Sequence, residues 1–338
     1  MSRRKVLAAA VGGLAGWGLW QARGGGGRAV AAAAGTPNRE PVVRTTKALG
    51  TDVSVTIAGA DAATVDRAVA AAFAELREVE DVLSVYRPDG QVGRLNRFGT
   101  VDGASPHLLA VLAASAETSR RSDGAFDITV QPLWDLHAAV ARAGRVPTDE
   151  EVEKARRLVD WRRVTVDGGR VRLGGAGMAV TFNGIAQGYA TDRVAAVLRA
   201  NGVAHALVDV GELAPIGRKT DGTPWTAGIQ HPREPDAYAA VARLDGRCLA
   251  TSGDYATAFD PDRTRHHIFD PATGRSPAAL ASVSIAAPTA MEADALSTAV
   301  FVLGPDKGRR LVERTPGADA LFVLKDGSAF KTAGFPSV

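Results

Sequence analysis

Residues 266–304 read HHIFDPATGRSPAALASVSIAAPTAMEADALSTAVFVLG, and the rest of the chain is organised around this stretch. The alternating apolar run SVSIAA at 282–287 predicts a strand. Thr289 and Glu292 then stand in the spacing of a capping box, so we expect a helix to begin there. Apolar residues at helical spacing continue this helix toward Gly304 and would face the core, namely Ala293, Leu296, Val300 and Leu303.

Asp294 and Thr298 lie four residues apart on this helix, which makes them neighbours on one face. We expect them on the helix surface, facing a cleft. A carboxylate and a hydroxyl placed in this way can both donate an oxygen to a hard cation such as Mg²⁺. The alternative is a solvated aspartate beside a threonine that bonds back to its own helix. The pair alone does not decide between the two.

The N-terminus has the features of an export signal. Arg3 and Arg4 precede a short apolar run at 6–20, and an alanine-rich segment follows. The paired arginines indicate the twin-arginine route. Cleavage is expected near 31–34, which places the mature protein in the periplasm or elsewhere outside the cytoplasm. An uncleaved signal would instead tether the protein to the membrane.

The basic charge of the chain belongs largely to this signal. Residues 1–34 hold five positive side chains and no acidic ones, so the net charge of +3 becomes +3 − 5 = −2 without them. Nucleic-acid binding is therefore not expected. Cys248 is the only cysteine, which excludes an intrachain disulfide. We expect a linker at 35–45 and one integrated domain at 46–338.

Turn and capping signals outline the remaining elements. Pro106 after Ser105 starts a helix, and Thr148 with Glu151 forms a second capping box. The block TFNGIAQGYATDRVAAVLRANG at 181–202 is expected to enter as a strand, turn at two glycines and continue as a helix. The further expected helices are 61–83, 105–121 and 132–143. The expected strands are 51–57, a hairpin at 164–173, one in ALVDVGE that ends at Asp209 and Gly211, one in TPWTAGIQHP at 223–232 and one in RCLATS at 247–252.

Several blocks occur in an order that is typical of one family. The chain resembles the ApbE family of FAD-dependent FMN transferases from about Thr46 to its C-terminus. The resemblance implies an α+β fold of mixed or antiparallel sheet packed by helices, with an FAD cleft between subregions. The blocks are ALGTDVSVTI at 48–57, GAFDITVQPLW at 124–134, NGIAQGYATDRV at 183–194, LVDVGE at 207–212, ATSGDY at 250–255, HHIFDPATG at 266–274 and ADALSTAVFVLG at 293–304.

The resemblance also implies a metal site. Asp294 and Thr298 would hold Mg²⁺ together with the backbone carbonyl near Ala186. Gln187 and Asp192 would belong to the same region, on the side that binds FAD. Two positions depart from the family pattern. Gln187 stands where many relatives have lysine, and Glu212 stands where many have a second glycine.

Further FAD contacts are implied by the matching blocks. The family usually has methionine at the position of Leu49, and this residue would pack against the flavin nucleotide. The alternative is an ordinary leucine of the core. Tyr86 would lie near FAD. The implied contacts in the two remaining blocks are Ala125, Phe126, Asp127 and Ile268.

His266 and His267 are adjacent and are expected to differ in role. Neighbours in an extended segment point to opposite faces, so only one can readily enter a cleft. The resemblance selects His267, which directly precedes the aliphatic residue of the motif, as the catalytic base. A neutral imidazole suits proton abstraction near neutral pH. A zinc site of two histidines is the rival, but no third ligand lies at a useful spacing.

The implied reaction is Mg²⁺-dependent transfer of FMN from FAD to a threonine of an acceptor protein, with release of AMP. We expect the acceptor to be a membrane-associated or exported redox protein. Two rivals remain open. One is a Mg²⁺-dependent FAD pyrophosphatase, in which water replaces the threonine. The other is an exported FAD carrier that performs no chemistry.

Overall fold

The computed structural model describes residues 40–234 and 236–338. The export signal predicted at 1–34 lies outside the described residues. Strand β1 begins at Val42, so the fold starts inside the range predicted as a linker. Among the helices of the described residues, none is both long and apolar enough to cross a membrane.

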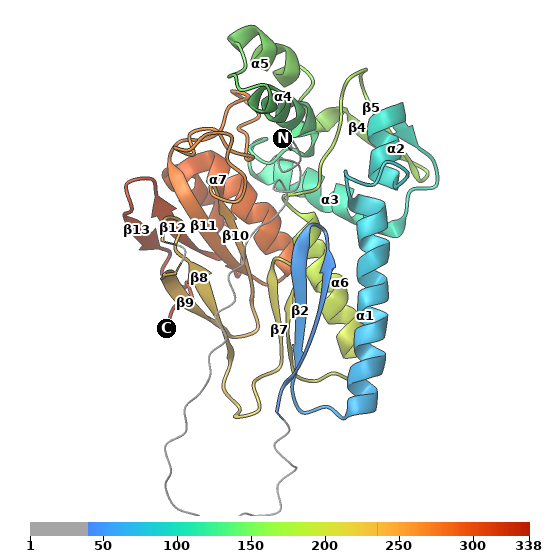
Figure 1. The fold of residues 1–338 in the computed structure, drawn as a ribbon, viewed down its shortest axis with the longest axis vertical. Helices are drawn as coiled ribbons and strands as arrows, with labels where there is room; N and C mark the ends of the chain where they lie inside the picture. Colours follow the sequence, from blue (N-terminus) through green and yellow to red (C-terminus); the bar gives the residue numbers. More distant parts are fainter. Residues whose placement is uncertain (1–39, 235) are drawn as a thin grey trace, which may run out of the picture.

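Within the described residues, an eight-stranded sheet forms the centre of the molecule (Figure 1). Every neighbouring pair in this sheet is antiparallel. In spatial order its strands are β1 (Val42–Ala48), β2 (Thr51–Ile57), β6 (Ala206–Asp209), β7 (Leu213–Ile216), β10 (Cys248–Gly253), β11 (Leu280–Ala287), β12 (Asp319–Leu324) and β13 (Ala329–Lys331).

Two smaller antiparallel sheets accompany the large one. The hairpin of β4 and β5 is the one expected at 164–173, and its turn is Asp-Gly-Gly-Arg. The strands of these sheets are β3 (Thr100–Val101), β5 (Arg170–Leu173) and β4 (Val164–Asp167) in one, and β8 (Trp225–Gln230) and β9 (Tyr238–Leu244) in the other.

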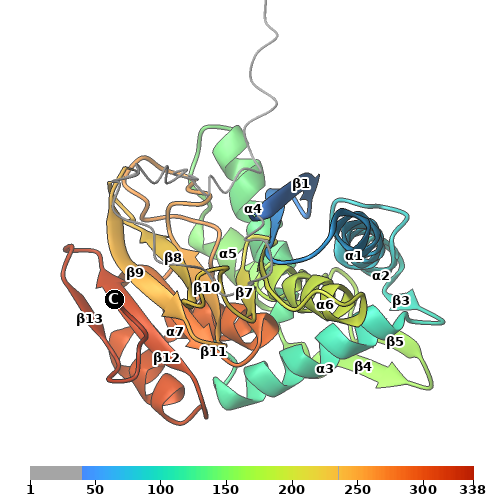
Figure 2. The ribbon, with the colours of Figure 1, turned by 90° about the horizontal axis from the view of Figure 1, so that it is seen from below.

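Helices cover one face of the large sheet. Helices α6 and α7 pack on its strands, and α1 packs on α6 (Figure 2). The α-helices are α1 (Ala62–Leu83), α2 (Gln91–Phe98), α3 (Pro106–Arg121), α4 (Gln131–Arg142), α5 (Asp149–Arg156), α6 (Ala186–Ala200) and α7 (Ala290–Glu313), with 3₁₀ turns at Ile128–Val130 and Trp161–Arg163.

The β8–β9 hairpin covers the opposite face, which explains why β11 is buried along its whole length. Val283 and Ile285 belong to the main core on the helix side. Ala286 belongs to a second core that contains Trp225 of β8. Apolar residues therefore follow both faces of this strand, as expected for a strand in the middle of a three-layer arrangement.

Local signals explain many of the element boundaries. Asp61 caps α1 by accepting from the amide of Thr64. Ser105 caps α3 in the same way, and Thr148 with Glu151 forms a complete capping box at α5. The β1–β2 hairpin turns at Leu49 and Gly50, whose φ values of 50° and 75° are those of a two-residue turn with both central residues left-handed.

Helix α7 begins and bends where its sequence requires. Thr289 caps it by accepting from the amide of Glu292. The side chain of Glu292 pairs with Arg121 on α3, so only half of the predicted capping box forms. Gly304 has φ of 73°, and the helix kinks there before it continues through Pro305. The predicted end near Gly304 is therefore a kink.

The predicted α+β class with antiparallel sheet is confirmed, but two local predictions differ from the structure. Helix α2 was not expected. The strand expected before Gly184 is absent, because residues 178–183 form no ladder with a neighbouring strand. The side chain of Asn96 instead bonds to both backbone groups of Val180, at 2.8 Å to its oxygen and 2.7 Å from its nitrogen. The Asn96 side chain of α2 thus makes with Val180 the two backbone hydrogen bonds that a neighbouring strand would otherwise make.

Candidate active site

The first turn of α6 lies unusually close to α7, and two glycines allow this approach. A Cβ atom at Gly188 would lie 2.3 Å from the carbonyl oxygen of Ala290 and 2.7 Å from Cβ of Asp294. A Cβ atom at Gly184 would lie 2.8 Å from Oγ1 of Thr298. Neither glycine needs a left-handed φ, since close packing alone excludes a side chain. We call Gly184, Gly188, Asp294 and Thr298 the α6–α7 junction.

Asp294 is buried at this junction, with 4% of its surface exposed. Its Oδ2 atom accepts a hydrogen bond from the amide of Gly188 at 2.9 Å. Burial raises the pKa of this carboxyl to about 7, against the opposing effect of the Gly188 bond. The expectation of an aspartate on the helix surface was therefore wrong, because the glycines bring α6 over it.

Two further buried carboxyl groups lie where β6 connects to β7: Asp209 ends β6, and Glu212 precedes β7 and lies close enough to Asp294 and Asp209 to be affected by both charges. Asp209 and Glu212 are 8% and 7% exposed. Burial raises the pKa of Asp209 to about 6. Burial, then the charges of Asp294 and Asp209, raise the pKa of Glu212 well above its usual value. No cation of the described residues contributes to the pKa of any of these three carboxyl groups.

Thr298 of α7 faces strand β10. Its hydroxyl lies 3.3 Å from that of Ser252 on β10, which also bonds to Ser297 at 2.8 Å. Thr298 therefore forms a hydrogen bond outside its own helix, contrary to the simpler expectation for an Asp-x-x-x-Thr pair. Together with Asp294 it places oxygen donors on one side of the junction.

The remaining residues predicted on α6 have clear surroundings. Ala186 is the first residue of the helix and is buried. Gln187 packs against Gly211 of the β6–β7 turn, where a Cβ would lie 2.9 Å from its amide group. Asp192 uses both carboxylate oxygens to accept the amides of Ala290 and Met291, each at 2.9 Å. It therefore caps α7, and its predicted place beside FAD stays a prediction.

The two adjacent histidines have different surroundings. His266 is fully buried, and its Nε2 lies 3.1 Å from the carbonyl oxygen of Pro277. Its Nδ1 accepts from the amide of Ile268 at 3.4 Å. Burial lowers the pKa of His266 to about 4. Both of its ring nitrogens are therefore engaged, and the ring packs edge-on against Phe301 of α7.

His267 is only partly buried, and its Nε2 has no hydrogen-bond partner among residues 40–234 and 236–338. Its Nδ1 lies 3.2 Å from the carbonyl oxygen of Thr257. A carbonyl can only accept, so Nδ1 carries the hydrogen and Nε2 of the neutral ring has a free lone pair. Burial lowers the pKa of His267, which favours this neutral form. The ring therefore has the protonation state that a base requires.

In the block from Ala125 to Asp127, the side chain of Asp127 stabilises the local backbone through hydrogen bonds. Asp127 accepts from the amide and the hydroxyl of Thr129, at 2.8 and 2.6 Å, and from the amide of Trp161 at 3.0 Å. Phe126 lies in the main core, as does Ile268 of the histidine segment. Ala125 is partly exposed. The FAD contacts predicted for these residues stay predictions.

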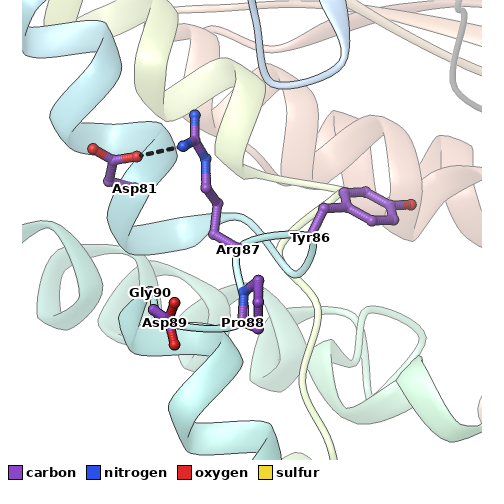
Figure 3. Close-up of a pocket in the computed structure, with 6 residues that line it drawn as sticks. All are labelled: Asp81, Tyr86, Arg87, Pro88, Asp89 and Gly90. Carbon is purple, nitrogen blue, oxygen red and sulfur yellow. Dashed lines mark ion pairs between the residues drawn. The ribbon is translucent and has the colours of Figure 1, made fainter.

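Leu49 and Tyr86 are the two predicted FAD contacts that stand near the surface. The amide of Leu49 is held by Glu80 of α1 at 3.2 Å. Tyr86 is 55% exposed, and burial of its hydroxyl raises its pKa, an effect that the nearby side chain of Asn183 partly opposes. Tyr86 lines a pocket of about 450 Å³ with Arg87 and four neighbouring residues, in which Arg87 pairs with Asp81 (Figure 3).

The structure brings Asp294, Thr298 and the start of α6 together, whereas their role as ligands of Mg²⁺ stays a prediction. It connects His267 to them only indirectly, through β10 and the loop that holds Thr257. Sequence reasoning missed Asp209 and Glu212 as buried acids. The only available signal was Glu212 at a position where the resemblance implies glycine.

The chain matches one family over most of its length. The model of the ApbE family matches residues 49–322. The FAD:protein FMN transferase of Vibrio cholerae is 31% identical over 264 residues, covering 76% of this chain and 79% of the relative. The enzyme of the same name from Escherichia coli is 30% identical over 298 residues, covering 85% of both chains.

The fold is also that of a solved flavin transferase. The crystal structure of the flavinyl transferase ApbE from Pseudomonas stutzeri, without ligand, superposes with a TM-score of 0.74 at 34% identity. The match covers 87% of this chain and 94% of that one.

Proposed function

The chain belongs to the ApbE family, and we propose that it transfers FMN from FAD to a threonine of an acceptor protein, using Mg²⁺ held at the α6–α7 junction. Transfer of FMN from FAD to a protein is the activity named for the Vibrio cholerae and Escherichia coli relatives. At this level the chain is an FAD:protein FMN transferase. The threonine, the metal ion and the roles of single residues form the proposed part.

The observation that carries the metal proposal is the buried acidic group at the junction. Asp294, Glu212 and Asp209 are buried together, and no described cation contributes to the pKa of any of them. Burying carboxylates is costly unless a cation compensates their charge. Carboxylate, hydroxyl and backbone carbonyl oxygens are the donors that Mg²⁺ takes from proteins. The residues at the junction therefore fit this ion.

In the proposed site, Asp294 and Thr298 hold Mg²⁺ together with the backbone carbonyl near Ala186. The ion would neutralise phosphate charge and stabilise the leaving group. Glu212 and Asp209 are further carboxyl groups of the same region, and a bound cation would favour their ionised forms. The close packing of Gly184 and Gly188 fixes the start of α6, so these donors are already in place before FAD binds.

His267 is proposed as the base. Its free Nε2 takes the proton from the acceptor hydroxyl while that oxygen attacks the FMN phosphorus of the pyrophosphate. The new bond joins the threonine oxygen to phosphorus. The bridging phosphorus–oxygen bond breaks, and AMP leaves with the bridging oxygen. His266 holds the segment in place through its bonds to Pro277 and Ile268.

The proposal is tested by incubating the protein with FAD, Mg²⁺ and a threonine-containing acceptor, then measuring the masses of all products. We expect the acceptor to gain FMN and AMP to appear in equal amount. Free FMN and AMP released at the same rate with and without acceptor would favour the pyrophosphatase alternative. Binding of FAD without any AMP would contradict both reactions and favour a carrier.

We also propose that the mature protein works outside the cytoplasm, on an exported or membrane-associated redox protein. Support comes from Arg3 and Arg4 and the apolar and alanine-rich runs behind them. Replacing both arginines by lysine should retain the protein in the cytoplasm, as measured by cell fractionation. Unchanged export of this Arg3→Lys, Arg4→Lys variant would contradict the twin-arginine route.

A further inference from the structure

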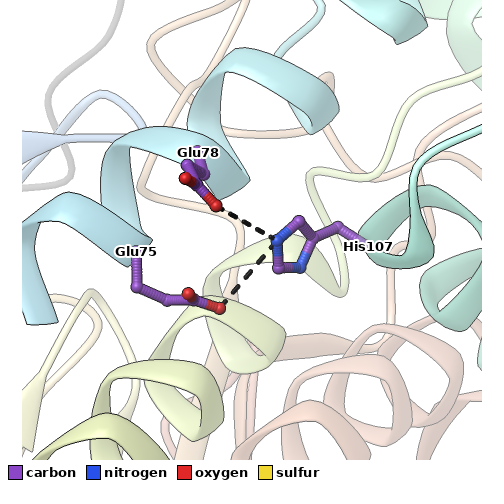
Figure 4. A group of neighbouring side chains, drawn as sticks. All are labelled: Glu75, Glu78 and His107. Carbon is purple, nitrogen blue, oxygen red and sulfur yellow. Dashed lines mark ion pairs between the residues drawn. The ribbon is translucent and has the colours of Figure 1, made fainter.

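A second group of metal-ligating side chains lies away from the α6–α7 junction. Glu75 and Glu78 of α1 and His107 of α3 point toward one another (Figure 4). One ligand atom from each lies within 4.8 Å of the other two. We propose that these three residues bind a divalent transition-metal ion, for which Zn²⁺ is the suitable probe. This inference is independent of the proposed transferase site.

The spacing of these residues follows from their elements. Glu75 and Glu78 are three residues apart on α1, so they share one face of that helix. His107 stands in the first turn of α3, directly after the cap formed by Ser105. The packing of α3 on α1 therefore brings the imidazole to the face that carries both carboxylates.

The distances in this group suit a shared ion better than direct hydrogen bonds. Nε2 of His107 lies 3.9 Å from Glu75 and 4.0 Å from Glu78. Both separations exceed the usual length of a hydrogen bond, about 2.7–3.2 Å. Ligands that each lie about 2.0–2.2 Å from a zinc ion are roughly 3–3.6 Å apart. Both separations exceed that spacing by less than 1 Å, so small inward movements of the Glu75 and Glu78 side chains would complete the geometry.

A third helix orients the histidine. Nδ1 of His107 lies 2.8 Å from the hydroxyl of Tyr189 on α6. When Nδ1–H donates to that hydroxyl, the lone pair of Nε2 points toward the carboxylates. A partner of this kind on the other ring nitrogen is the usual arrangement for a metal-bound histidine. Tyr189 is buried and lies outside the three ligands, so it is a separate observation in favour of a site.

The competing interpretation is an ordinary ion-pair network. Arg193 of α6 lies 2.7 Å from Glu75 and would compensate one of the two carboxylates. One positive charge does not compensate the second carboxylate, that of Glu78, whose ion pair within the described residues is the one with His107. The two interpretations differ in the predicted effect of Arg193. In a metal site it competes with the ion for Glu75, whereas in a network it is the main partner.

The imidazole argues for a transition metal. Mg²⁺ prefers oxygen donors only, whereas imidazole suits zinc and its neighbours. Two carboxylates and one imidazole leave a further coordination position for water. A bound ion would join α1, α3 and, through Tyr189, the first turn of α6. The preceding residue, Gly188, donates to Asp294, so the two sites flank the same turn.

The test is a Zn²⁺ titration of the metal-free full-length chain, followed by calorimetry and, with Co²⁺, by visible absorption. We expect one site that is weakened at least about tenfold in Glu78→Gln and in His107→Gln. The side chain of Glu78 is 73% exposed, so its replacement should not impair folding. Arg193→Gln should bind Zn²⁺ more tightly than wild type, because the competing cation is gone.

A matched control is available in the pair of His231 and Glu234, which lie 3.9 Å apart without a second carboxylate. His231→Gln should bind Zn²⁺ as wild type does. Wild-type affinity in both Glu78→Gln and His107→Gln would overturn the proposal. Loss of the Zn²⁺ site in Asp294→Asn with its retention in Glu78→Gln would also overturn it, because the ion would then lie at the α6–α7 junction.

Discussion

Asp254 and Asp294 are both buried aspartates, but their pKa values are shifted in opposite directions. Asp254, at the end of β10, is fully buried and receives two bonds from Arg233, at 2.8 and 2.7 Å, and a third from Lys325. Burial pushes the pKa of Asp254 up, but these cations outweigh it and the pKa is lowered. Asp294 receives one amide bond and, from the described part of the chain, no bond from a cation, and burial raises its pKa to about 7.

We propose that this difference distinguishes a carboxylate of the scaffold from a carboxylate of the metal site. The charge of Asp254 is compensated by Arg233 and Lys325, so this carboxylate needs no ligand and joins the segments that carry these two cations. A buried carboxylate without a cation is costly, and it is retained where a ligand supplies the missing charge. The same distinction applies to the histidines, since His266 has both nitrogens bonded and His267 has one free.

The largest expected effect concerns the two histidines. His267→Ala should lower the rate of FMN transfer by about 10²–10⁴ while FAD binding survives, because the imidazole acts mainly in the transition state. Single-turnover kinetics with a separate FAD-binding assay would measure both quantities.

His266→Ala provides the contrast. Removing a buried ring with two bonded nitrogens should lower the melting temperature, with little change in the rate per folded molecule. Equal rate losses at both positions, or loss of FAD binding together with activity in His267→Ala, would show that the segment builds the pocket and supplies no base.

The next effect distinguishes the two aspartates. Asp294→Asn keeps the shape of the side chain and its bond from Gly188 but removes the charge that would hold Mg²⁺. We expect a loss of roughly 10²–10³ in rate, the size typical of losing one electrostatic contact in an active site. The melting temperature of the metal-free protein should stay level or rise, because a costly buried charge is gone.

Asp254→Asn should behave in the opposite way. It leaves Arg233 and Lys325 without their acceptor charge and should lower the free energy of unfolding by about 1–3 kcal/mol. Chemical denaturation would measure this change. A stable Asp254→Asn together with an unstable Asp294→Asn would reverse the distinction drawn between the two carboxylates.

A smaller effect is expected from pH. The pKa of Asp294 is raised from 3.8 to about 7 in the folded protein, so the metal-free fold loses stability as pH rises through that range. Part of this loss falls between pH 6 and pH 8, because the carboxyl group of Asp294 gives up its proton around pH 7. Mg²⁺ should offset it, so the rise in melting temperature caused by Mg²⁺ should be larger at pH 8.

Asp294→Asn is the control for this measurement. The variant has no carboxyl group at position 294, so the difference between pH 6 and pH 8 in the effect of Mg²⁺ should largely disappear. An equal Mg²⁺ effect at both pH values in the wild type would argue against an ionising carboxylate in the metal site.

Local patterns in the sequence were sufficient for much of the fold. The capping box at Thr148 and Glu151 and the cap at Asp61 mark helix starts because each involves residues three apart. Strand β2 was predicted with its observed bounds, since Val53, Val55 and Ile57 alternate on one buried face. Helix α2 was missed because its eight residues bury only two apolar side chains.

The parts that escaped prediction depend on residues far apart in the chain. The bond from Gly188 to Asp294 joins positions 106 apart, and the cap from Asp192 to Ala290 joins positions 98 apart. No short window contains both partners. The family resemblance supplied which residues to consider, but the burial of Asp294 and its acidic neighbours became visible only once α6 was placed against α7.

The central claim is that the unpaired acids at the α6–α7 junction hold the ion on which FMN transfer depends. It is tested most directly by measuring AMP release from FAD against Mg²⁺ concentration in wild type, Asp294→Asn and Asp254→Asn. We expect saturation by Mg²⁺ in the wild type, the same midpoint for folded Asp254→Asn, and a midpoint at least about tenfold higher, or no release, for Asp294→Asn. Wild-type rate and midpoint in Asp294→Asn would contradict the account.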